Sequence, residues 1–541
     1  MKNNNYEFSR YLIETFSVFG VKHAFVSPGS RNTPLMLALS DQSKIKVTNV
    51  IDERVSGFMA LGTATHSKLP AIVVVTSGSA LGNLFPSIIE SYMSNIPIII
   101  ITADRPKNLI STGANQTIDQ NNIFGKYVHK FFDIIVKKRN NDEAIKIAKD
   151  SILNSINFKS PVHINMHFDL PLHEIRKNDF KCDINQSVFT KYEVNKEIEI
   201  PNFTNFKKPI IICTNDNDIE IVKRFEKYKI PIFMESIGTR FQIKSKNLIS
   251  NYQFILKNQY ISPDLIIRFG KKPISNILND FINQNKNLTY LVTDKYFNDD
   301  SINVIETSNE KFISQFCDQK FNFSEKWFNE IISYNENIQK CLEDFFSEPK
   351  EHEGYIINKI LDKIPFDSNL FIGNSSPIRD LDQYAFNCSK SINVFCNRGA
   401  SGIDGLISTS LGISIDSNKH NFAIIGDMSF FYDMSALLNA QKINNLTIIV
   451  LNNSGGHIFD RLKGISSEKD YKKLWLNPVM LDIKSIAISF KCNYQLIDYN
   501  ELEKLNLSKS VSNTIKIIEI RVDSGKHKKN NQKIYKRIDN L

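Results

Sequence analysis

The chain has 541 residues, of which 42% are hydrophobic, 11% aromatic and 23% charged, and its 67 Lys and Arg against 58 Asp and Glu give a net charge of +9. A chain of this length normally divides into several domains, and this composition excludes the collagen-like, low-complexity and disordered classes. The positive charge is too small and too diffuse to indicate a nucleic-acid-binding protein, although it would suit an enzyme that handles small anions.

Neither the N-terminal segment nor the apolar runs indicate secretion or membrane insertion. The strongest apolar run, Ile96 to Ile101, is far shorter than the roughly 20 residues of a membrane-spanning helix. The seven cysteines are scattered, odd in number and without a CxxC pair, which favours reduced thiols and argues against a zinc site or a disulfide framework. We therefore expect a cytoplasmic protein.

Short runs rich in β-branched residues alternate with longer amphipathic stretches along the chain. This pattern is typical of βαβ units, so the predicted fold class is α/β with open parallel sheets. We expect three domains at 1–175, 190–335 and 350–541, with a polar linker near 169–205 and a charged helix near 324–350. The expected strands, in chain order, are 71–76, 96–102, 161–166, 209–214, 231–234, 265–269, 288–293, 370–373, 422–426, 447–451 and 515–522.

Polar loops follow several of these strands in the first and third domains, where open α/β sheets place their ligands. Taken alone, each loop is more often a turn with a helix cap. Arg31 and Arg105 are less easily explained in that way, because a guanidinium group holds a carboxylate through two parallel hydrogen bonds. The polar segments are 27–34, 76–80, 102–106, 113–120, 373–379 and 397–405.

The strongest pattern is Gly426-Asp427 followed, 26 positions after Asp427, by Asn453 in the run Asn452-Asn453-Ser454-Gly455-Gly456. Two neighbouring parallel strands would bring a carboxylate and a carboxamide to one sheet edge, and such hard oxygen ligands suit Mg²⁺ with phosphate. The glycines would let the backbone approach the ion and the phosphates closely. Either half alone would be an ordinary turn, but together they match the GD…NN pattern of thiamine-diphosphate enzymes.

That cofactor requires a carboxylate facing N1′ of its aminopyrimidine ring. Glu53, at the start of a predicted helix in the first domain, is the best candidate, although a Glu at a helix start is usually only favourable dipole placement. Asp104 is the competitor, but its neighbours suit a substrate loop better.

Taken together, the loops resemble one family of thiamine-diphosphate enzymes, the 2-succinyl-5-enolpyruvyl-6-hydroxy-3-cyclohexene-1-carboxylate synthases of menaquinone biosynthesis. The resemblance extends from about residue 7 to the C-terminal tail and is weakest in the middle domain. It implies a pyrimidine-binding, a middle and a diphosphate-binding domain, each built on an open parallel sheet. The motifs that carry it are SPGSRNTP, DERVSGF, TSGSA, TADRP, GANQTIDQ, GNSSPIRD, NRGASGIDG, GDMSFFYD and NNSGGHIF.

The resemblance implies a transferase of aldehyde or ketone residues. Such an enzyme decarboxylates 2-oxoglutarate and adds the succinyl-semialdehyde carbanion to isochorismate, and both substrates are dicarboxylates that arginines would bind. The implied cofactors are thiamine diphosphate and Mg²⁺ or Mn²⁺. The implied assembly is a homodimer or homotetramer with its active sites at the subunit interface, where Glu53 of one chain reaches a cofactor held by the other. Neither nucleic acid nor a transmembrane segment is expected.

The same resemblance implies individual residue roles. The catalytic residues would be Glu53, Gln116 and Arg398. The substrates would contact Ser30, Arg31, Arg105, Asn115, Arg379, Ile458 and Phe459. The cofactor would contact Glu53, Ser375, Ile403, Asp427, Met428, Ser429, Asn453 and Gly455, with Asp427, Asn453 and the Gly455 carbonyl as metal ligands. One departure is Ser275-Asn276, where the family more usually has Ser-Lys. If that lysine contacts a substrate carboxylate, Lys271 or Lys272 would substitute for it.

Two alternatives remain open. Another thiamine-diphosphate enzyme, such as a 2-oxo acid decarboxylase or an acetolactate-type synthase, would share the metal site and the glutamate but would not need four arginines facing the substrates. A non-catalytic relative is the second alternative, and the presence of Glu53, Asp427 and Asn453 argues against it.

Overall fold

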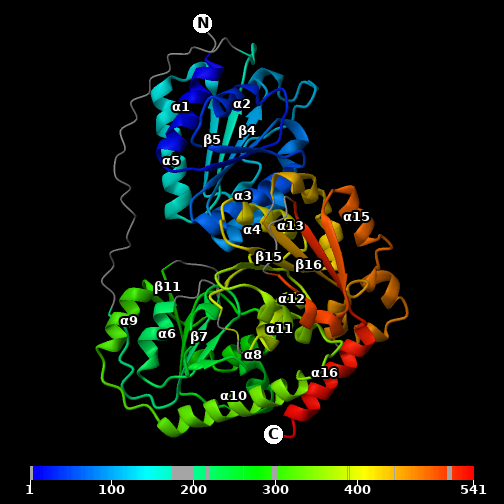
Figure 1. The fold of residues 1–541 in the computed structure, drawn as a ribbon. Coiled ribbons are helices and arrows are strands. Elements are labelled where there is room, and N and C mark those ends of the chain that lie inside the picture. The colour runs from blue at the N-terminus through cyan, green and yellow to red at the C-terminus, as the bar shows by residue number, and fades with distance from the viewer. Residues whose placement is uncertain are drawn as a thin grey trace.

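A computed structural model describes residues 4–173, 199–214, 219–259, 261–294, 301–386, 388, 390–443, 445–462, 464–507 and 514–541. Three six-stranded sheets, each formed by parallel strand pairs, follow one another along the chain (Figure 1). The predicted α/β class with three parallel-sheet domains is therefore confirmed. Most of the predicted linker, 174–198, lies outside the described residues.

The first sheet has the strand order β2-β1-β3-β4-β6-β5. One hydrophobic cluster under α1, α2 and α5 and another under α3 and α4 cover its two faces, which explains why its central strands are apolar on both sides. The elements are α1 (Asn5–Val18), β1 (His23–Val26), α2 (Thr33–Ser40), β2 (Lys46–Asn49), α3 (Glu53–Ser67), β3 (Ala71–Val75), α4 (Phe85–Ser94), β4 (Ile98–Asp104), β5 (Lys130–Ile135), α5 (Asn141–Asn157) and β6 (Val162–His167).

The second sheet has the order β12-β11-β10-β7-β8-β9. Read along the chain this is the doubly wound order 3-2-1-4-5-6, which differs from that of the first sheet. Its elements are β7 (Pro209–Cys213), α6 (Ile219–Glu226), β8 (Ile232–Met234), β9 (Leu248–Ile249), α7 (Tyr252–Asn258), β10 (Leu265–Phe269), α8 (Asn276–Gln284), β11 (Thr289–Thr293), β12 (Asn303–Glu306) and α9 (Asn309–Cys317). The long helix α10 (Glu325–Phe345) then leads to the third domain.

The third sheet has the order β14-β13-β15-β16-β18-β17, which repeats the order of the first sheet strand for strand. In this arrangement the chain reverses direction across the sheet between β13 and β15, and such a switch point is where open α/β sheets bind ligands. The elements are α11 (Glu353–Lys363), β13 (Asn369–Ile372), α12 (Ser376–Tyr384), β14 (Asn393–Phe395), α13 (Leu406–Ile415), β15 (Asn421–Gly426), α14 (Asp427–Tyr432), β16 (Leu446–Asn452), α15 (Ile483–Ser489), β17 (Asn493–Ile497), β18 (Lys516–Arg521) and α16 (Ser524–Ile538).

The first and third domains pack through α3 and α13, which lie together between the two sheets (Figure 1). The helices approach so closely that a Cβ atom on Gly62 would lie 2.0 Å from the Thr409 carbonyl oxygen, and one on Gly412 would lie 2.1 Å from the Met59 carbonyl oxygen. The Thr63 hydroxyl donates to the Gly412 carbonyl at 2.8 Å. This contact fixes α3, whose first residue is Glu53, against the third domain.

We expect Gly412→Ala to lower the free energy of unfolding by about 1–3 kcal/mol, because the added methyl group would force the two helix backbones apart. Gly82→Ala is the matched control, since no heavy atom lies within 4 Å of a Cβ built there. Urea unfolding followed by circular dichroism measures both variants. Equal stability of the two would contradict a close α3–α13 crossing.

Candidate functional site

Asp427 begins α14 directly after β15, at the switch point of the third sheet. Its Oδ1 accepts from the Met428 backbone N–H at 2.9 Å, and its Oδ2 accepts from the Gly455 N–H at 2.8 Å. Only 3% of the residue is exposed. Burial raises the pKa of the Asp427 carboxyl to about 6, because the loss of solvent outweighs the two backbone hydrogen bonds and the charge of His457.

Asn453, one residue beyond β16, presents an unpaired oxygen at the same edge. Its Nδ2 donates to the Glu353 carboxyl at 2.7 Å, whereas its Oδ1 is buried without a hydrogen-bond partner. A buried acceptor without a partner costs free energy and calls for an explanation. A cation would supply that partner.

Gly455 lies beside Asp427 at this edge, and its own carbonyl accepts from the His457 N–H at 2.9 Å. It has φ +134°, and a Cβ there would lie 2.5 Å from the Leu476 carbonyl oxygen, so only glycine fits. Among the described residues no group of three His, Cys, Asp or Glu side chains is placed to hold a metal. An ion here would therefore depend on amide and carbonyl oxygens beside the one carboxylate, a donor set that suits Mg²⁺.

Behind Asn453 lies a buried charged cluster that the sequence did not reveal. Burial, followed by the charge of Asp380, raises the pKa of Glu353 to about 8. Asp380 in turn pairs with Arg461, with Nη2 to Oδ1 at 2.6 Å. These residues come from α11, α12 and the turn 457–461, and no local motif marks them as neighbours.

The loop after β13 forms the other side of the switch point. Ser375 is the N-cap of α12 with φ +76°, an unusual conformation for a non-glycine residue, and its side chain makes no capping hydrogen bond. Asn374 Nδ2 braces the loop by donating to the carbonyls of Asn397 at 2.8 Å and Gly402 at 2.7 Å. The Ile378 N–H of this first turn donates to the Gly373 carbonyl at 3.1 Å. The positive end of the α12 dipole lies at this loop, and such a helix start favours phosphate.

Two pairs of arginines converge at the edges of the outer sheets. Arg31 is 5% exposed, and burial followed by the charge of Arg105 lowers its pKa. In the third domain, burial followed by the charge of Arg398 lowers the pKa of Arg379. The Nε atoms of Arg31 and Arg105 are buried without partners. Neighbouring guanidinium groups repel one another, so each pair is suited to binding an anion.

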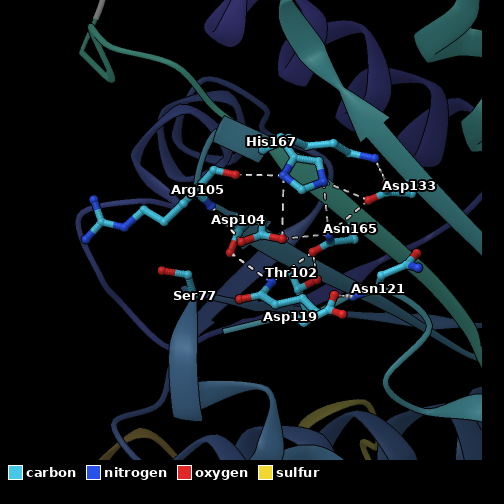
Figure 2. A network of polar contacts seen from close by, with 12 residues as sticks. Ser77, Thr102, Asp104, Arg105, Asp119, Asn121, Asp133, Asn165 and His167 are labelled. Carbon is cyan, nitrogen blue, oxygen red and sulfur yellow. Dashed lines mark hydrogen bonds and ion pairs between the residues drawn. The ribbon is translucent and has the colours of Figure 1, made fainter. Parts of the chain in front are cut away.

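A network of polar side chains holds the backbone of Arg105 (Figure 2). Asp104 Oδ1 accepts from the Arg105 N–H at 2.7 Å, and His167 Nδ1 lies 2.6 Å from the Arg105 carbonyl oxygen. His167 Nε2 lies 2.8 Å from Asp133 Oδ1, and Asn165 donates to Asp104 at 2.9 Å. Figure 2 shows the Arg105 side chain extending away from this network. Asp104 therefore holds the backbone of the Arg105 loop. It ends β4, whereas Glu53 begins a helix.

The polar segments 76–80 and 113–120 lie against each other within the chain, so both can contribute to one site. Gln116 Nε2 donates to the Ser77 carbonyl at 3.0 Å, and the Ser77 hydroxyl donates to the Gln116 carbonyl at 3.0 Å. Gln120 Oε1 accepts from the Gly78 N–H at 3.0 Å. Asn115, Gln116 and Ser30 are exposed, whereas Ile458 and Phe459 are half-buried in the turn 457–461.

Glu53 lies at the start of α3, next to the third domain of its own chain. Its carboxylate accepts from Asn83 Nδ2 at 3.0 Å. The preceding residue, Asp52, caps α3 and accepts from the Ser435 hydroxyl at 2.8 Å. Within the described residues of one chain, Glu53 makes no hydrogen bond to Asp427 or Asn453, the proposed metal ligands.

The Ser275-Asn276 departure falls at a helix start, because Ser275 caps α8 and its hydroxyl accepts from Leu278 N. Lys271 donates to the Met93 carbonyl, which links the middle domain to the first. Lys271 and Arg398 both line a cavity of about 650 Å³ at the junction of the three domains.

Comparisons with known proteins identify chains similar to this one along almost its whole length. Residues 6–123 match the family model described as thiamine pyrophosphate enzyme, N-terminal TPP binding domain. The 2-succinyl-5-enolpyruvyl-6-hydroxy-3-cyclohexene-1-carboxylate synthases of Listeria innocua and Listeria welshimeri are 31% and 32% identical, each with 99% of both chains covered. The synthase of Lysinibacillus sphaericus is 29% identical over 96% of this chain and 95% of its own length.

A solved structure of benzoylformate decarboxylase from Polynucleobacter necessarius is similar with a TM-score of 0.71, covering 97% of this chain and 99% of that one. At 14% identity this likeness concerns the fold alone. In the part of the chain that the structure describes, no helix has the length and apolar character needed to cross a membrane.

The network around Arg105 rests partly on His163, whose Nε2 lies 2.8 Å from the Thr102 hydroxyl. Burial lowers the pKa of His163 from 6.5 to about 3. As pH falls below about 6.5 the unfolded chain binds a proton that the folded chain excludes, so this histidine destabilises the fold at acidic pH. We therefore expect the free energy of unfolding of His163→Gln to rise relative to that of the wild type as the pH falls. The difference should grow by about 2 kcal/mol from about pH 7.5 to about pH 5.

Urea unfolding of both proteins across this pH range measures that change. Thr102→Val is the control, because it removes the same hydrogen bond without removing a titrating group, and its difference from wild type should not vary with pH. A pH-independent difference for His163→Gln would show that His163 takes up a proton in the folded chain.

Proposed function

The chain belongs to the 2-succinyl-5-enolpyruvyl-6-hydroxy-3-cyclohexene-1-carboxylate synthase family of thiamine-diphosphate-dependent enzymes, and we propose that it decarboxylates 2-oxoglutarate and transfers the remaining four-carbon unit to isochorismate. The family resemblance predicted from the loop motifs is confirmed by relatives that match along the whole chain. The observation that supports this substrate pair best is the presence of two arginine pairs, Arg31 with Arg105 and Arg379 with Arg398. Two dicarboxylate substrates would use both pairs.

The metal and the cofactor diphosphate are proposed to bind at the switch point of the third sheet. Asp427, Asn453 and the Gly455 carbonyl would hold Mg²⁺ or Mn²⁺, because the first is a desolvated carboxylate and the second offers a buried unpaired oxygen. Ser375 would lie beside the diphosphate at the N-terminus of α12, with Met428 and Ser429 of α14 nearby. Ile403, which is 37% exposed, offers an apolar surface under the cofactor. When bound, thiamine diphosphate supplies the electron sink for the loss of CO₂.

Glu53 is proposed to hold the proton at N1′ of the aminopyrimidine ring. Because no hydrogen bond in the described residues joins Glu53 to Asp427 or Asn453 of its own chain, we propose that it serves the cofactor of a partner chain in a homodimer or a homotetramer. Large apolar side chains around the start of α3 are exposed in the single chain, namely Ile51 at 73%, Tyr432 at 50% and Leu438 at 53%. A partner chain would cover this surface.

The remaining side chains are proposed to orient the substrates. Arg31 and Arg105, with the exposed Ser30 and Asn115 on nearby loops, would bind one carboxylate region. Gln116 and Arg398 would contact the reacting atoms, and the half-buried Ile458 and Phe459 would form a wall along the four-carbon unit. We also propose a cytoplasmic location, because the seven cysteines are scattered, odd in number and without a CxxC pair.

Turnover assays test this function against other thiamine-diphosphate chemistry. With thiamine diphosphate, Mg²⁺, 2-oxoglutarate and isochorismate, we expect release of CO₂ together with consumption of isochorismate. Replacing 2-oxoglutarate by pyruvate should abolish turnover, because pyruvate lacks the second carboxylate. Turnover of pyruvate without consumption of isochorismate would favour a decarboxylase or an acetolactate-type synthase.

Glu53→Gln should lower kcat by about 10²-fold or more, since loss of a positioned proton-transfer group typically costs that much. Its unfolding temperature should stay close to that of the wild type, because Glu53 is partly exposed and an amide can still accept from Asn83. Glu330→Gln on α10 is the control for the same substitution away from the site. Unchanged turnover by Glu53→Gln would remove Glu53 from the proposed role.

A further inference from the structure

We propose that Glu353 is a positioning residue that orients the amide of Asn453, so that its oxygen and not its nitrogen faces the metal. This inference rests on the proposed metal site, and it concerns a residue that no motif in the sequence indicated. Glu353 is 3% exposed, and its carboxyl group accepts a hydrogen bond from the Asn453 amide.

The orientation of the Asn453 amide is a question of hydrogen-bond polarity. The oxygen and the NH₂ group of an asparagine side chain have nearly the same size, so shape alone does not decide which one points toward a site. The Glu353 carboxyl oxygen accepts from Asn453 Nδ2 at 2.7 Å. That bond commits the nitrogen to Glu353 and leaves Oδ1, which has no partner in the chain, for the ion.

The neighbouring residue provides an internal comparison. Asn452 also donates its Nδ2 to a buried glutamate, Glu519, at 2.8 Å, but its Oδ1 accepts from the Ser454 backbone N–H at 3.1 Å. Both ends of the Asn452 amide are therefore satisfied within the chain. Of these two adjacent asparagines, only Asn453 has its nitrogen bound and its oxygen left over.

Glu353 is itself held by three other segments of the third domain. Its backbone N–H donates to His527 Nδ1 on α16 at 3.1 Å, and the ring of His352, the N-cap of α11, stacks on His527 with centroids 4.5 Å apart. Its carboxyl group lies beside Asp380 on α12, which Arg461 binds at 2.6 Å. With its position fixed in this way, Glu353 is suited to hold a ligand that lies on a loop.

Binding of Mn²⁺ to the full-length protein with thiamine diphosphate, followed by electron paramagnetic resonance, tests the proposal without relying on turnover. Glu353→Met keeps the length of the side chain but removes the acceptor, and we expect it to weaken Mn²⁺ binding about 10-fold or more. Glu353→Gln should bind nearly as the wild type does, because its carbonyl still accepts from Asn453 and its NH₂ group donates to Asp380.

Glu519→Met is the matched control, since it removes the acceptor of the Asn452 amide, whose oxygen is paired in the chain. It should leave Mn²⁺ affinity close to that of the wild type, even if it lowers the unfolding temperature. Wild-type affinity in folded Glu353→Met, or equal weakening in Glu353→Gln, would overturn the proposal. Failure of the wild-type protein to bind Mn²⁺ with thiamine diphosphate would instead contradict the proposed metal site.

A second measurement does not depend on the folding of a variant. A neutron structure of the wild-type protein with thiamine diphosphate and Mg²⁺ distinguishes the nitrogen of Asn453 from its oxygen. We expect the deuterated nitrogen to face Glu353. A nitrogen that faces the ion would overturn the proposal.

Discussion

The burial of a carboxylate and of an unpaired amide oxygen at one sheet edge is the constraint on which the rest of the site depends. Asp427 is desolvated and Asn453 Oδ1 lacks a partner, and each such group lowers stability, by about 1–3 kcal/mol for a neutral acceptor. A cation bound by both would offset this cost, which gives the holoprotein a stability that the empty chain lacks. The glycine at position 455 belongs to the same constraint, since a side chain there would collide with the Leu476 carbonyl.

The repeated strand order of the two outer domains gives one chain two equivalent switch points. Equivalent switch points in the first and third sheets present different chemistry. Polar loops proposed to bind the substrates lie at the first, and the proposed oxygen ligands and an uncapped helix lie at the third. The α3–α13 crossing fixes the first domain on the third, so that Glu53 is held at a defined place. Cofactor, metal and substrates would then be bound by surfaces that are rigid before binding, which lowers the entropic cost of assembling the site.

Different parts of this arrangement could be predicted from the sequence to different degrees. The α/β class and the central strands follow from local apolar runs such as Ile98–Asp104, which is buried along its whole length, and the GD…NN pattern marks Asp427 and Asn453 because its spacing reflects one strand–helix–strand unit. Three residues of the buried cluster, Glu353, Asp380 and His527, could not be found from such patterns.

They meet only through the packing of α11, α12 and α16, and no short spacing in the sequence connects them. The same holds for His167 and Asp133, which reach the Arg105 loop from strands that are distant in sequence. Motifs therefore identify groups that would touch the ligand, whereas the side chains that hold them depend on tertiary structure.

In the proposed assembly, Glu53 of one chain and the metal edge of another form each active site. The most direct measurement mixes two inactive variants, Glu53→Gln and Asp427→Asn, after dissociation and reassembly of the subunits. If sites are shared between chains, each mixed dimer contains one intact site, and random pairing should restore about a quarter of wild-type activity. If each site lies within one chain, every site carries a substitution and the mixed dimers stay inactive. Inactive mixed dimers would therefore contradict active sites shared between chains.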